Sequence, residues 1–449
     1  MFSTLSSQPV HAVFDEPDTT SDGGALLVKA ADQRLGLTEA LAACLEDTRA
    51  AERIDHTLHD LLRQRIYGLA LGYEDANDAA RVGNDPMHKL LLDRDPLSGA
   101  PLASQPTLSR FENGVDMRAL LILGNRLADT VLDRVKARRR DRPPGLITID
   151  LDPTCDATHG RQQLSFFHGH YDTWCYLPTL GFVTPNDESE SFLVAAVLRS
   201  GRAPDKEGAI GILRRLIAKV RSRFPHSRVR VRLDAGFMAP EVLDFLDDAG
   251  VEYVVGYANN PLLAQECAAW TEETQRCYEE CGHPVQVFGE LAYSAKTWKG
   301  KTRRLIVKAE VVEALGREPK VNLRFVVTNL RHKPENLYAL YCQRGDIENR
   351  VKELKAGVAL DRTSCTDFWA NQLRVLMAAA AFAILQELRT RLQGTGLARA
   401  QVERLRLCLL RIGARIERSV RRIVVHLAAA HPWQPPWAKA AVALGASRL

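Results

Sequence analysis

The chain has 449 residues, which is enough for two or three domains that each bury their own core. Hydrophobic residues make up 46% of the chain and charged residues 26%, as in an ordinary soluble globular protein. No run approaches the roughly 18–20 apolar residues of a membrane span, so we expect no membrane contact and a buried helix at 375–385. Nine cysteines, an odd number, argue against a complete disulfide framework, and the N-terminus has no signal-peptide pattern; we expect the cytoplasm.

Positive charge is unevenly distributed, although the net charge is only +5. Residues 366–449 hold 13 Lys and Arg against 4 Asp and Glu, and eight Lys or Arg lie between 214 and 232 without an acid. Each cluster by itself is explained equally well by a solvent-exposed helix face and by a polyanionic partner. Two such clusters on one chain favour a polyanionic partner.

The N-terminal third is predicted to be helical. Residues 1–35 are expected to form a tail with short strands at 10–14 and 25–31. From 36 to 140, apolar residues recur at three- and four-residue spacing, which predicts a helical domain. The basic, proline-containing stretch "RRRDRPPG" at 138–145 ends this domain.

Strands then alternate with helices. Segment 145–259 predicts three strands, a helix, a strand, a helix and a strand, with Asp205 as a candidate N-cap of the first helix. This order favours an α/β fold with a mixed sheet covered by helices. Segment 260–332 shows strand-like stretches with no helix among them, which predicts an inserted β-rich subdomain. Residues 333–390 return to helix, and 391–449 predict a basic helical C-terminal region.

The stretch "YCQRGDIENRVKELK" at 341–355 predicts one helix with two stripes. Aliphatic side chains form a packing stripe. At about 100° per residue, Tyr341, Arg344, Glu348 and Lys355 share a second arc of roughly 60°, and Lys352 lies at the edge of this arc. A solvated row of ion pairs, worth ~0.2–0.5 kcal/mol each, explains this arc. The alternative is a metal-binding carboxylate flanked by cations that hold phosphates.

Two further acids favour the second interpretation. Asp152 and Asp234 each end an alternating strand and precede a strand-breaking element, and ligands of α/β sheets gather at strand ends. With Glu348 they would form an oxygen-rich site for Mg²⁺, which binds one or two carboxylates together with substrate phosphates. Two such ions, ~3.5–4 Å apart, activate the attacking oxygen and stabilise the leaving oxygen in an in-line displacement. We expect two Mg²⁺ ions, with Mn²⁺ as a substitute.

The spacing Tyr341-(2)-Arg344-(3)-Glu348-(6)-Lys355 resembles the Y-(2)-R-(3)-E-(6)-K signature of DDE transposases in the bacterial IS-four superfamily. The stretches "DLDPTCDATHGRQQLSFFHGHYDTWCYLP", "RLDAGF" and "YCQRGDIENRVKELK" are most similar to the IS thirteen-eighty family of insertion sequences, itself distantly similar to piggyBac elements. The resemblance covers about residues 40–430. It implies an RNase H-like catalytic core interrupted by a β-rich insertion before the glutamate helix.

The resemblance also implies roles for individual residues. The catalytic, metal-binding acids would be Asp152, Asp234 and Glu348, with Asp150 on the same strand face and the nearby Asp156 as alternatives to Asp152. The aromatic or cationic groups that would contact DNA are Tyr341, Arg344, Lys352 and Lys355. In the insertion, Trp298 would stack on an unpaired base, and Arg303 and Arg304 would contact phosphates. Packing of Trp298 in a core, and plain exposure of the two arginines, are the alternatives.

The function implied is that of a cut-and-paste transposase. The helical domain at 36–140 would bind terminal inverted repeats, and the core would cleave the transposon ends, through hairpin ends, and join 3′-hydroxyl groups to target DNA. The partner implied is double-stranded DNA, and a homodimer is expected in the complex with it. The alternatives are a catalytically silent, transposase-derived DNA-binding regulator and an RNase H-like nuclease. A regulator has no need of three intact acids, and a nuclease has no need of the insertion or the helical domain.

Overall fold

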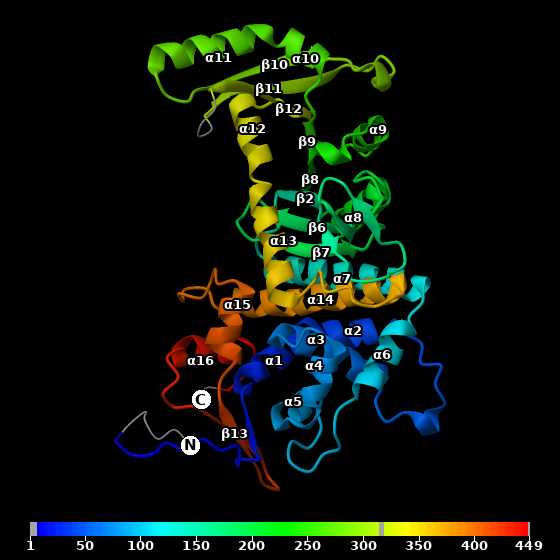
Figure 1. Ribbon diagram of the computed structural model, residues 1–449, viewed down its shortest axis with the longest axis vertical. Coiled ribbons are helices and arrows are strands. Elements are labelled where there is room, and N and C mark those ends of the chain that lie inside the picture. Colours follow the sequence, from blue (N-terminus) through cyan, green and yellow to red (C-terminus); the bar gives the residue numbers. More distant parts are fainter. Residues whose placement is uncertain (1–6, 314–317, 448–449) are drawn as a thin grey trace. The chain divides into compact units, whose positions relative to one another are not determined.

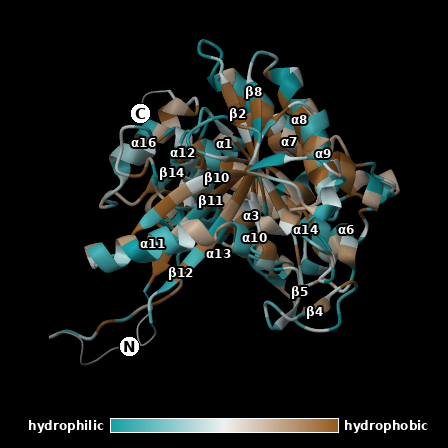
Figure 2. Ribbon diagram, turned by 90° about the horizontal axis from the view of Figure 1, so that it is seen from above, coloured by the Kyte–Doolittle hydropathy of each residue, from teal (hydrophilic) through white to brown (hydrophobic). Residues whose placement is uncertain are grey.

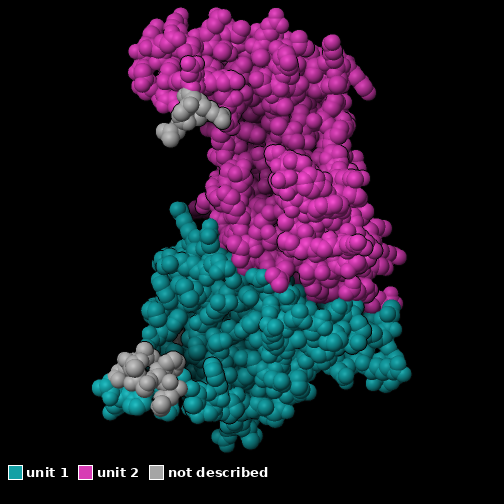
Figure 3. Space-filling view, viewed as in Figure 1, with its two compact units in different colours: residues 1–34, 47–111, 384–449 teal, residues 35–46, 112–383 magenta. Residues whose placement is uncertain are grey.

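The computed structural model describes residues 7–313 and 318–447, and the chain folds into two compact units (Figures 1 and 3). Unit 1 consists of residues 1–34, 47–111 and 384–449. Unit 2 consists of residues 35–46 and 112–383. The segment 36–140, expected as one helical domain, thus contributes 47–111 to unit 1 and its remainder to unit 2.

Unit 1 combines short helices with a small sheet in the order β1-β13-β14. Its strands are β1 (Thr19–Thr20), β13 (Ala414–Arg418) and β14 (Ile423–Leu427). Its helices are α1 (Leu26–Leu35), α3 (Leu58–Leu71), α4 (Ala76–Arg81), α5 (Pro86–Leu91), α6 (Gln105–Asn113), α15 (Val402–Leu405) and α16 (Gln434–Ala443). Capping boxes begin two of them, with Thr57 and Asp60 at α3 and Asp75 and Asp78 at α4.

Two expectations for the ends of the chain are wrong. Residues 26–31, within the predicted strand at 25–31, lie in α1, because Leu27, Val28 and Ala31 are buried at helical spacing and Ala, Leu and Lys are good helix formers. Segment 391–449 is not purely helical, because it contains the antiparallel pair β13 and β14. Alternating burial in β13 shows the two-residue period of a strand.

Unit 2 is built on one mixed sheet in the order β10-β11-β12-β9-β8-β2-β6-β7. In its middle, β2 pairs with β6 antiparallel and with β8 parallel, and β8 pairs with β9 parallel. The strands are β2 (Leu146–Pro153), β6 (Thr179–Pro185), β7 (Phe192–Val197), β8 (Arg228–Leu233), β9 (Glu252–Tyr257), β10 (Gln286–Tyr293), β11 (Arg303–Val312) and β12 (Lys320–Thr328). With α8 (Ala209–Arg223) and α9 (Pro240–Asp248), the predicted order from 145 to 259 is confirmed in this sheet.

The remaining elements of unit 2 surround this sheet. A small sheet in the order β3-β5-β4 lies between β2 and β6 in sequence, with β3 (Asp156–Ala157), β4 (Phe166–His168) and β5 (Thr173–Tyr176). The helices are α2 (Leu37–Ala42), α7 (Met117–Arg138), α12 (Pro334–Cys342), α13 (Gly345–Val358) and α14 (Phe368–Thr390). α14 is long and apolar enough for a membrane span, but 89% of its most apolar window is buried, as expected for a core helix.

Segment 260–332 differs from the prediction in two ways. It contains two helices, α10 (Pro261–Glu266) and α11 (Ala268–Cys281), where none was expected among the strands. Its strands also extend the large sheet, because β12 pairs with β9, so they do not form a separate sheet. α12 packs on this part of the sheet through a core that includes Val254, Ile306 and Val326.

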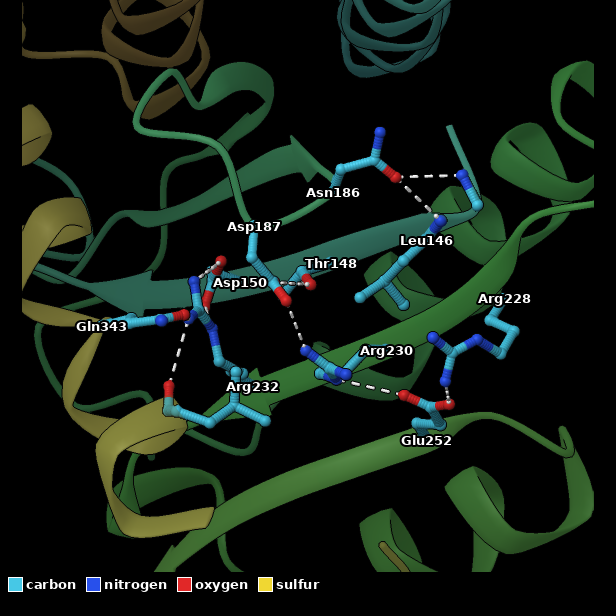
Figure 4. A network of polar contacts seen from close by, with 12 residues as sticks. Leu146, Thr148, Asp150, Asn186, Asp187, Arg228, Arg230, Arg232, Glu252 and Gln343 are labelled. Carbon is cyan, nitrogen blue, oxygen red and sulfur yellow. Dashed lines mark hydrogen bonds and ion pairs between the residues drawn. The ribbon is translucent and has the colours of Figure 1, made fainter. Parts of the chain in front are cut away.

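The two central strands are apolar on one face and carry paired charges on the other. Ile147, Ile149 and Leu151 of β2 are fully buried, and β2 and β8 are rich in hydrophobic residues (Figure 2). The opposite face carries a buried polar network, in which Arg230 donates to Asp187 and Glu252 (Figure 4). Burying a charge is costly unless it is paired, so these partners explain the placement of the charges.

Part of the basic cluster between 214 and 232 forms ion pairs within unit 2, while Arg214, Arg215 and Arg221 are exposed. On α8, Lys219 bonds Asp129 and Arg223 bonds both Asp129 and Asp133 of α7. The arginines of β8 pair with acids of neighbouring segments. The cluster thus supplies ion pairs between elements of unit 2. Neither exposure to solvent nor a polyanionic partner accounts for all of its charges.

Candidate active site

Asp152 and Asp234 lie at corresponding ends of adjacent parallel strands. The register pairs Asp150 of β2 with Arg232 of β8, so Asp152 and Asp234, two residues farther along, follow at the same edge. The Asp234 carboxylate accepts a hydrogen bond from the Gly236 amide at 2.8 Å and caps the short turn Ala235–Phe237. The parallel register therefore places the side chains of Asp152 and Asp234 on the same face of the sheet, at the same edge.

Arg344 lies between the two carboxylates. Its Nη2 atom is 2.5 Å from Asp152 Oδ1 and 3.5 Å from Asp234 Oδ2. The arginine is buried, so its charge is poorly screened by solvent. One guanidinium thus partly neutralises both acids.

The electrostatics are those of a crowded acidic site. Burial raises the pKa of Asp152 to about 6; Arg344 opposes this shift, while the charges of Asp234 and Glu348 add to it. Burial also raises the pKa of Asp234, again against the effect of Arg344. Glu348 is exposed on the first turns of α13 but within electrostatic range of Asp152. The structure therefore joins Asp152 and Asp234 through Arg344, while Glu348 is linked to them only through its electrostatic effect on Asp152.

The predicted single helix over 341–355 is wrong. α12 ends at Cys342 and α13 begins at Gly345, and the Arg344 amide donates to the Tyr341 carbonyl in the turn between them. The signal for the break is Gly345, because glycine costs about 1 kcal/mol relative to alanine in a helix interior. Tyr341 and Glu348 thus lie on different helices and do not share one arc. The turn directs Arg344 inward to the acids.

Tyr341 is half-buried beside Asp234. It packs against the core beneath α12, and the Arg344 guanidinium carbon lies 6.0 Å from its ring centroid. A Cβ atom on Gly256 of β9 would lie 2.6 Å from the Tyr341 hydroxyl and 2.9 Å from the Ala235 amide nitrogen. Glycine at this position therefore lets the phenol reach the segment that follows Asp234.

The two lysines of α13 differ in their surroundings. Lys355 is partly buried, and its ammonium donates to the Cys155 carbonyl in the segment after Asp152. This bond ties α13 to the end of β2. Lys352 is exposed on the same helix.

The two alternatives to Asp152 have other partners. Asp150 is fully buried and accepts two hydrogen bonds from Arg232, at 2.7 and 2.9 Å (Figure 4). Arg232 also donates to the Leu340 carbonyl and to Gln343, so this pair braces the turn that presents Arg344. Asp156 accepts a hydrogen bond from Thr363 at 2.8 Å, and burial raises its pKa to about 8.

The predicted DNA contacts of segment 260–332 are buried or paired. Trp298 is 3% exposed and packs edge-on against Tyr257 and Tyr293, so the core-packing alternative describes it. Arg303 is buried in ion pairs with two acids of α9. Arg304 bonds Glu290 and backbone carbonyls. The expected exposure is wrong for Arg303, which β11 carries into the large sheet, whereas Arg304 remains partly exposed.

Asp205 is an acid near the site for which the sequence predicted only helix capping. The N-cap of α8 is instead Gly208. A Cβ atom on Gly236 would lie 2.1 Å from Asp205 Oδ2, so the carboxylate faces the segment after Asp234, and its charge helps raise the pKa of Asp234. The glycine of "LDAGF" was the available signal, because a close approach by a neighbour requires a missing side chain.

The donor atoms suit a hard divalent cation. Carboxylate oxygens are the ligands that Mg²⁺ prefers, and the guanidinium of Arg344 stands where a cation would balance Asp152 and Asp234. In the conformation described for residues 7–313 and 318–447, no three His, Cys, Asp or Glu side chains are close enough together to hold a metal ion. The three predicted acids are therefore not gathered around one ion in this conformation of the described residues.

A comparison with family models matches residues 2–448 to the family described as "Transposase DDE domain group 1". The chain belongs to this family of DDE transposases. A search of curated proteins finds no match. As a member of the family, the chain is a transposase, a class of DNA-acting enzymes that generally use divalent metals. The mixed α/β architecture fits this assignment.

Proposed function

We propose that this DDE transposase binds terminal inverted repeats, cleaves DNA at the transposon ends and joins the 3′-hydroxyl ends to target DNA. The observation that carries the proposal is the pairing of Asp152 and Asp234 at the ends of adjacent parallel strands, with Glu348 in electrostatic range. Acids crowded so that their pKa values rise are typical of functional sites, where a bound cation stabilises the charge.

The strand arrangement supports an RNase H-like catalytic core. Strands β7, β6, β2, β8 and β9 lie side by side in that order, with the first three antiparallel to one another and the last three parallel. Counted along the chain, Asp152 lies at the end of β2, the first of these strands, and Asp234 directly follows β8, the fourth. Residues 260–332 are then an addition between the fifth strand and α12, consistent with an insertion before the glutamate helix.

We assign Asp152, Asp234 and Glu348 as the ligands of two Mg²⁺ ions. Bound Mg²⁺ would supply the positive charge that activates the attacking oxygen and stabilises the leaving oxygen of the phosphodiester. Asp152 must be deprotonated to act as a ligand, which its pKa of about 6 allows at neutral pH. The other acids near it, Asp150 and Asp156, have partners that hold them away from Asp234.

The cations and the phenol around the acids are proposed to hold the DNA backbone. Arg344 would exchange its carboxylate partners for a phosphate when the site is loaded, since a planar guanidinium suits bidentate phosphate contacts. Lys352 is already exposed, and Lys355 and Tyr341 lie on the flanks of Asp152 and Asp234. A homodimer in the DNA complex and a route through hairpin ends belong to the same proposal and follow from the similarity to the IS thirteen-eighty family.

The test is Mg²⁺-dependent cleavage of duplexes that carry the inverted repeats flanking the coding sequence. We expect Asp234→Asn and Glu348→Gln to reduce cleavage to background while repeat binding persists. Asp346→Asn is the matched control, because Asp346 is an exposed acid on the same first turn of α13 and should leave cleavage unchanged. Undiminished cleavage by either acid variant would refute the mechanism.

A further inference from the structure

The hairpin formed by β13 and β14 in unit 1 ends in an exposed tip. Every residue from 417 to 423 is exposed, and Val420 at the tip is 106% exposed. Farther from the tip, Ile416 is fully buried, so the ribbon is anchored in unit 1. β13 runs away from the helices of this unit (Figure 1). A single exposed valine is ordinary on a protein surface, so the neighbours of Val420 decide what the tip can do.

The tip has a defined shape. β13 pairs with β1 on one side and with β14 on the other, which fixes the base of the ribbon. In the turn, the Ser419 amide donates to the Arg422 carbonyl at 2.9 Å, and the Ser419 hydroxyl accepts from the Arg422 amide at 3.3 Å. Arg418 forms an ion pair with Asp95, which lies beyond α5 in the same unit. The exposure of the tip is therefore a property of an ordered hairpin.

The hairpin is also strongly basic. Residues 411–422 contain five arginines and one acid, in the most basic part of the chain. The acid is Glu417, which is paired with Arg415 at 2.7 Å and with His426 at 3.3 Å. On either side of the turn, Arg421 and Arg422 are exposed and form no ion pair with the residues that the structure describes. Planar guanidinium groups presented in this way suit an anionic partner with paired acceptor atoms.

The dimensions of the ribbon distinguish between the two grooves of DNA. The backbones of two paired strands lie about 4.7–4.9 Å apart. With side chains on both strands, such a ribbon is too wide for the minor groove, which is about 6 Å wide, but it enters the major groove, which is about 12 Å wide. The floor of the major groove presents thymine methyl groups to apolar side chains and the O6 and N7 atoms of guanine to arginine. The tip carries both kinds of side chain.

We propose that the tip of the β13–β14 hairpin enters the major groove of the terminal inverted repeat. Val420 would contact a thymine methyl group, and the arginines beside it, Arg421 and Arg422, would bind guanine. The proposal rests on the proposed function, which supplies the inverted repeat as the duplex. It places sequence recognition outside the segment 36–140, in the C-terminal part of unit 1. Contacts of the same arginines to phosphates would add affinity but carry no sequence information.

The test is a double-mutant cycle between the tip and single groups of the DNA. Binding of the full chain to repeat duplexes is measured by fluorescence anisotropy in EDTA, so that no cleavage intervenes. In the probes, each thymine is replaced in turn by uracil, which lacks the methyl group, and each guanine by 7-deazaguanine, which lacks N7. We expect wild type to lose affinity about 4-fold at one thymine and about 5-fold or more at one guanine.

The variants should each lose one of these responses. Val420→Ser should bind the unmodified duplex more weakly and show no further loss at that thymine. The double variant Arg421→Gln and Arg422→Gln should behave in the same way at that guanine. Val420→Ile keeps an apolar tip and should retain the response to uracil.

Two matched controls lie in unit 1 outside the hairpin. Val442 is an exposed valine on α16, and Arg34 is an exposed arginine on α1. Val442→Ser and Arg34→Gln should respond to the modified bases as wild type does.

The outcomes separate this proposal from the proposed catalytic function. Equal responses of wild type, Val420→Ser and the arginine double variant at every modified base would overturn the placement of the tip in the major groove, whatever the cleavage result. So would a double variant that binds all duplexes equally weakly with a reduced salt dependence, since this is the behaviour of phosphate contacts. Base responses that the tip variants lose, with no Mg²⁺-dependent cleavage by wild type, would support the tip and count against the catalytic function.

Discussion

Replacing Asp152 by asparagine should stabilise the metal-free transposase at neutral pH. Burial raises the pKa of this carboxyl from 3.8 to about 6, so the folded state favours its protonated form. The unfolded chain loses this proton near pH 4 and the folded chain only near pH 6, so stability falls as the pH rises between these values. Since one pKa unit corresponds to about 1.4 kcal/mol, ionised Asp152 destabilises the fold by as much as ~3 kcal/mol above pH 6.

Asparagine resembles the protonated carboxyl and removes this effect. We expect Asp152→Asn to raise the unfolding temperature at pH 7.5 in EDTA and to raise it by roughly a third as much at pH 4.5, measured by calorimetry or circular dichroism. For a unit of 150–250 residues, 1 kcal/mol shifts the melting temperature by about 2–4 °C, so several degrees are expected. Added Mg²⁺ should then stabilise wild type more than the variant.

Asp150→Asn is the control, because Asp150 lies on the same face of β2 but forms a buried ion pair with Arg232. Breaking such a pair leaves an uncompensated charge and typically costs 3–5 kcal/mol. This variant should therefore be destabilised. Two results would refute the account of Asp152 as an unfavourable buried charge. One is a melting temperature of Asp152→Asn at pH 7.5 as low as that of Asp150→Asn. The other is an equal rise of the melting temperature at both pH values.

Three further predictions concern the surroundings of the acids. Arg344→Gln removes the charge that lowers the pKa of Asp152, so the pH profile of Mg²⁺-dependent cleavage should move to higher pH; an unshifted profile would contradict this role. Gly256→Ala places a Cβ atom 2.6 Å from the Tyr341 hydroxyl and 2.9 Å from the Ala235 amide nitrogen, so it should lower the melting temperature and reduce cleavage strongly; wild-type values of both would argue against the clash. Asp156→Asn should raise the melting temperature at pH 8 and less at pH 5, because burial raises the pKa of Asp156 to about 8 and its ionised form is disfavoured in the fold.

The central sheet could be predicted from sequence because its strands carry strong local patterns. The alternation in "GLITIDLDPT" and "RVRVRLDAGF" indicates β2 and β8, and the acids that follow mark their ends. Which acid of β2 faces Asp234 could not be predicted, since Asp150 and Asp152 project from the same face. That distinction depends on Arg232, which binds Asp150. The two residues are 82 apart in the sequence and come together only because β8 pairs with β2.

The extent of the sheet could not be predicted either. Strands β10, β11 and β12 read as a separate subdomain because nothing local indicates that β12 pairs with β9. The same pairing explains why Trp298 and Arg303 are buried. Both residues look suited to DNA from their chemistry, but their exposure is decided by packing against Tyr257 and the acids of α9.

The break between α12 and α13 shows how a local departure from helix serves the site. In a continuous helix, Arg344 would lie on the same stripe as Glu348 and Lys355. The turn at Gln343 and Arg344 directs the guanidinium between Asp152 and Asp234, and the bonds from Arg232 to Leu340 and Gln343 hold that turn in place. Because Arg232 is itself held by Asp150, this buried ion pair positions the cation that balances Asp152 and Asp234. We therefore expect substitutions of Asp150 to disturb metal-dependent cleavage through the position of Arg344, although Asp150 has no place among the proposed ligands.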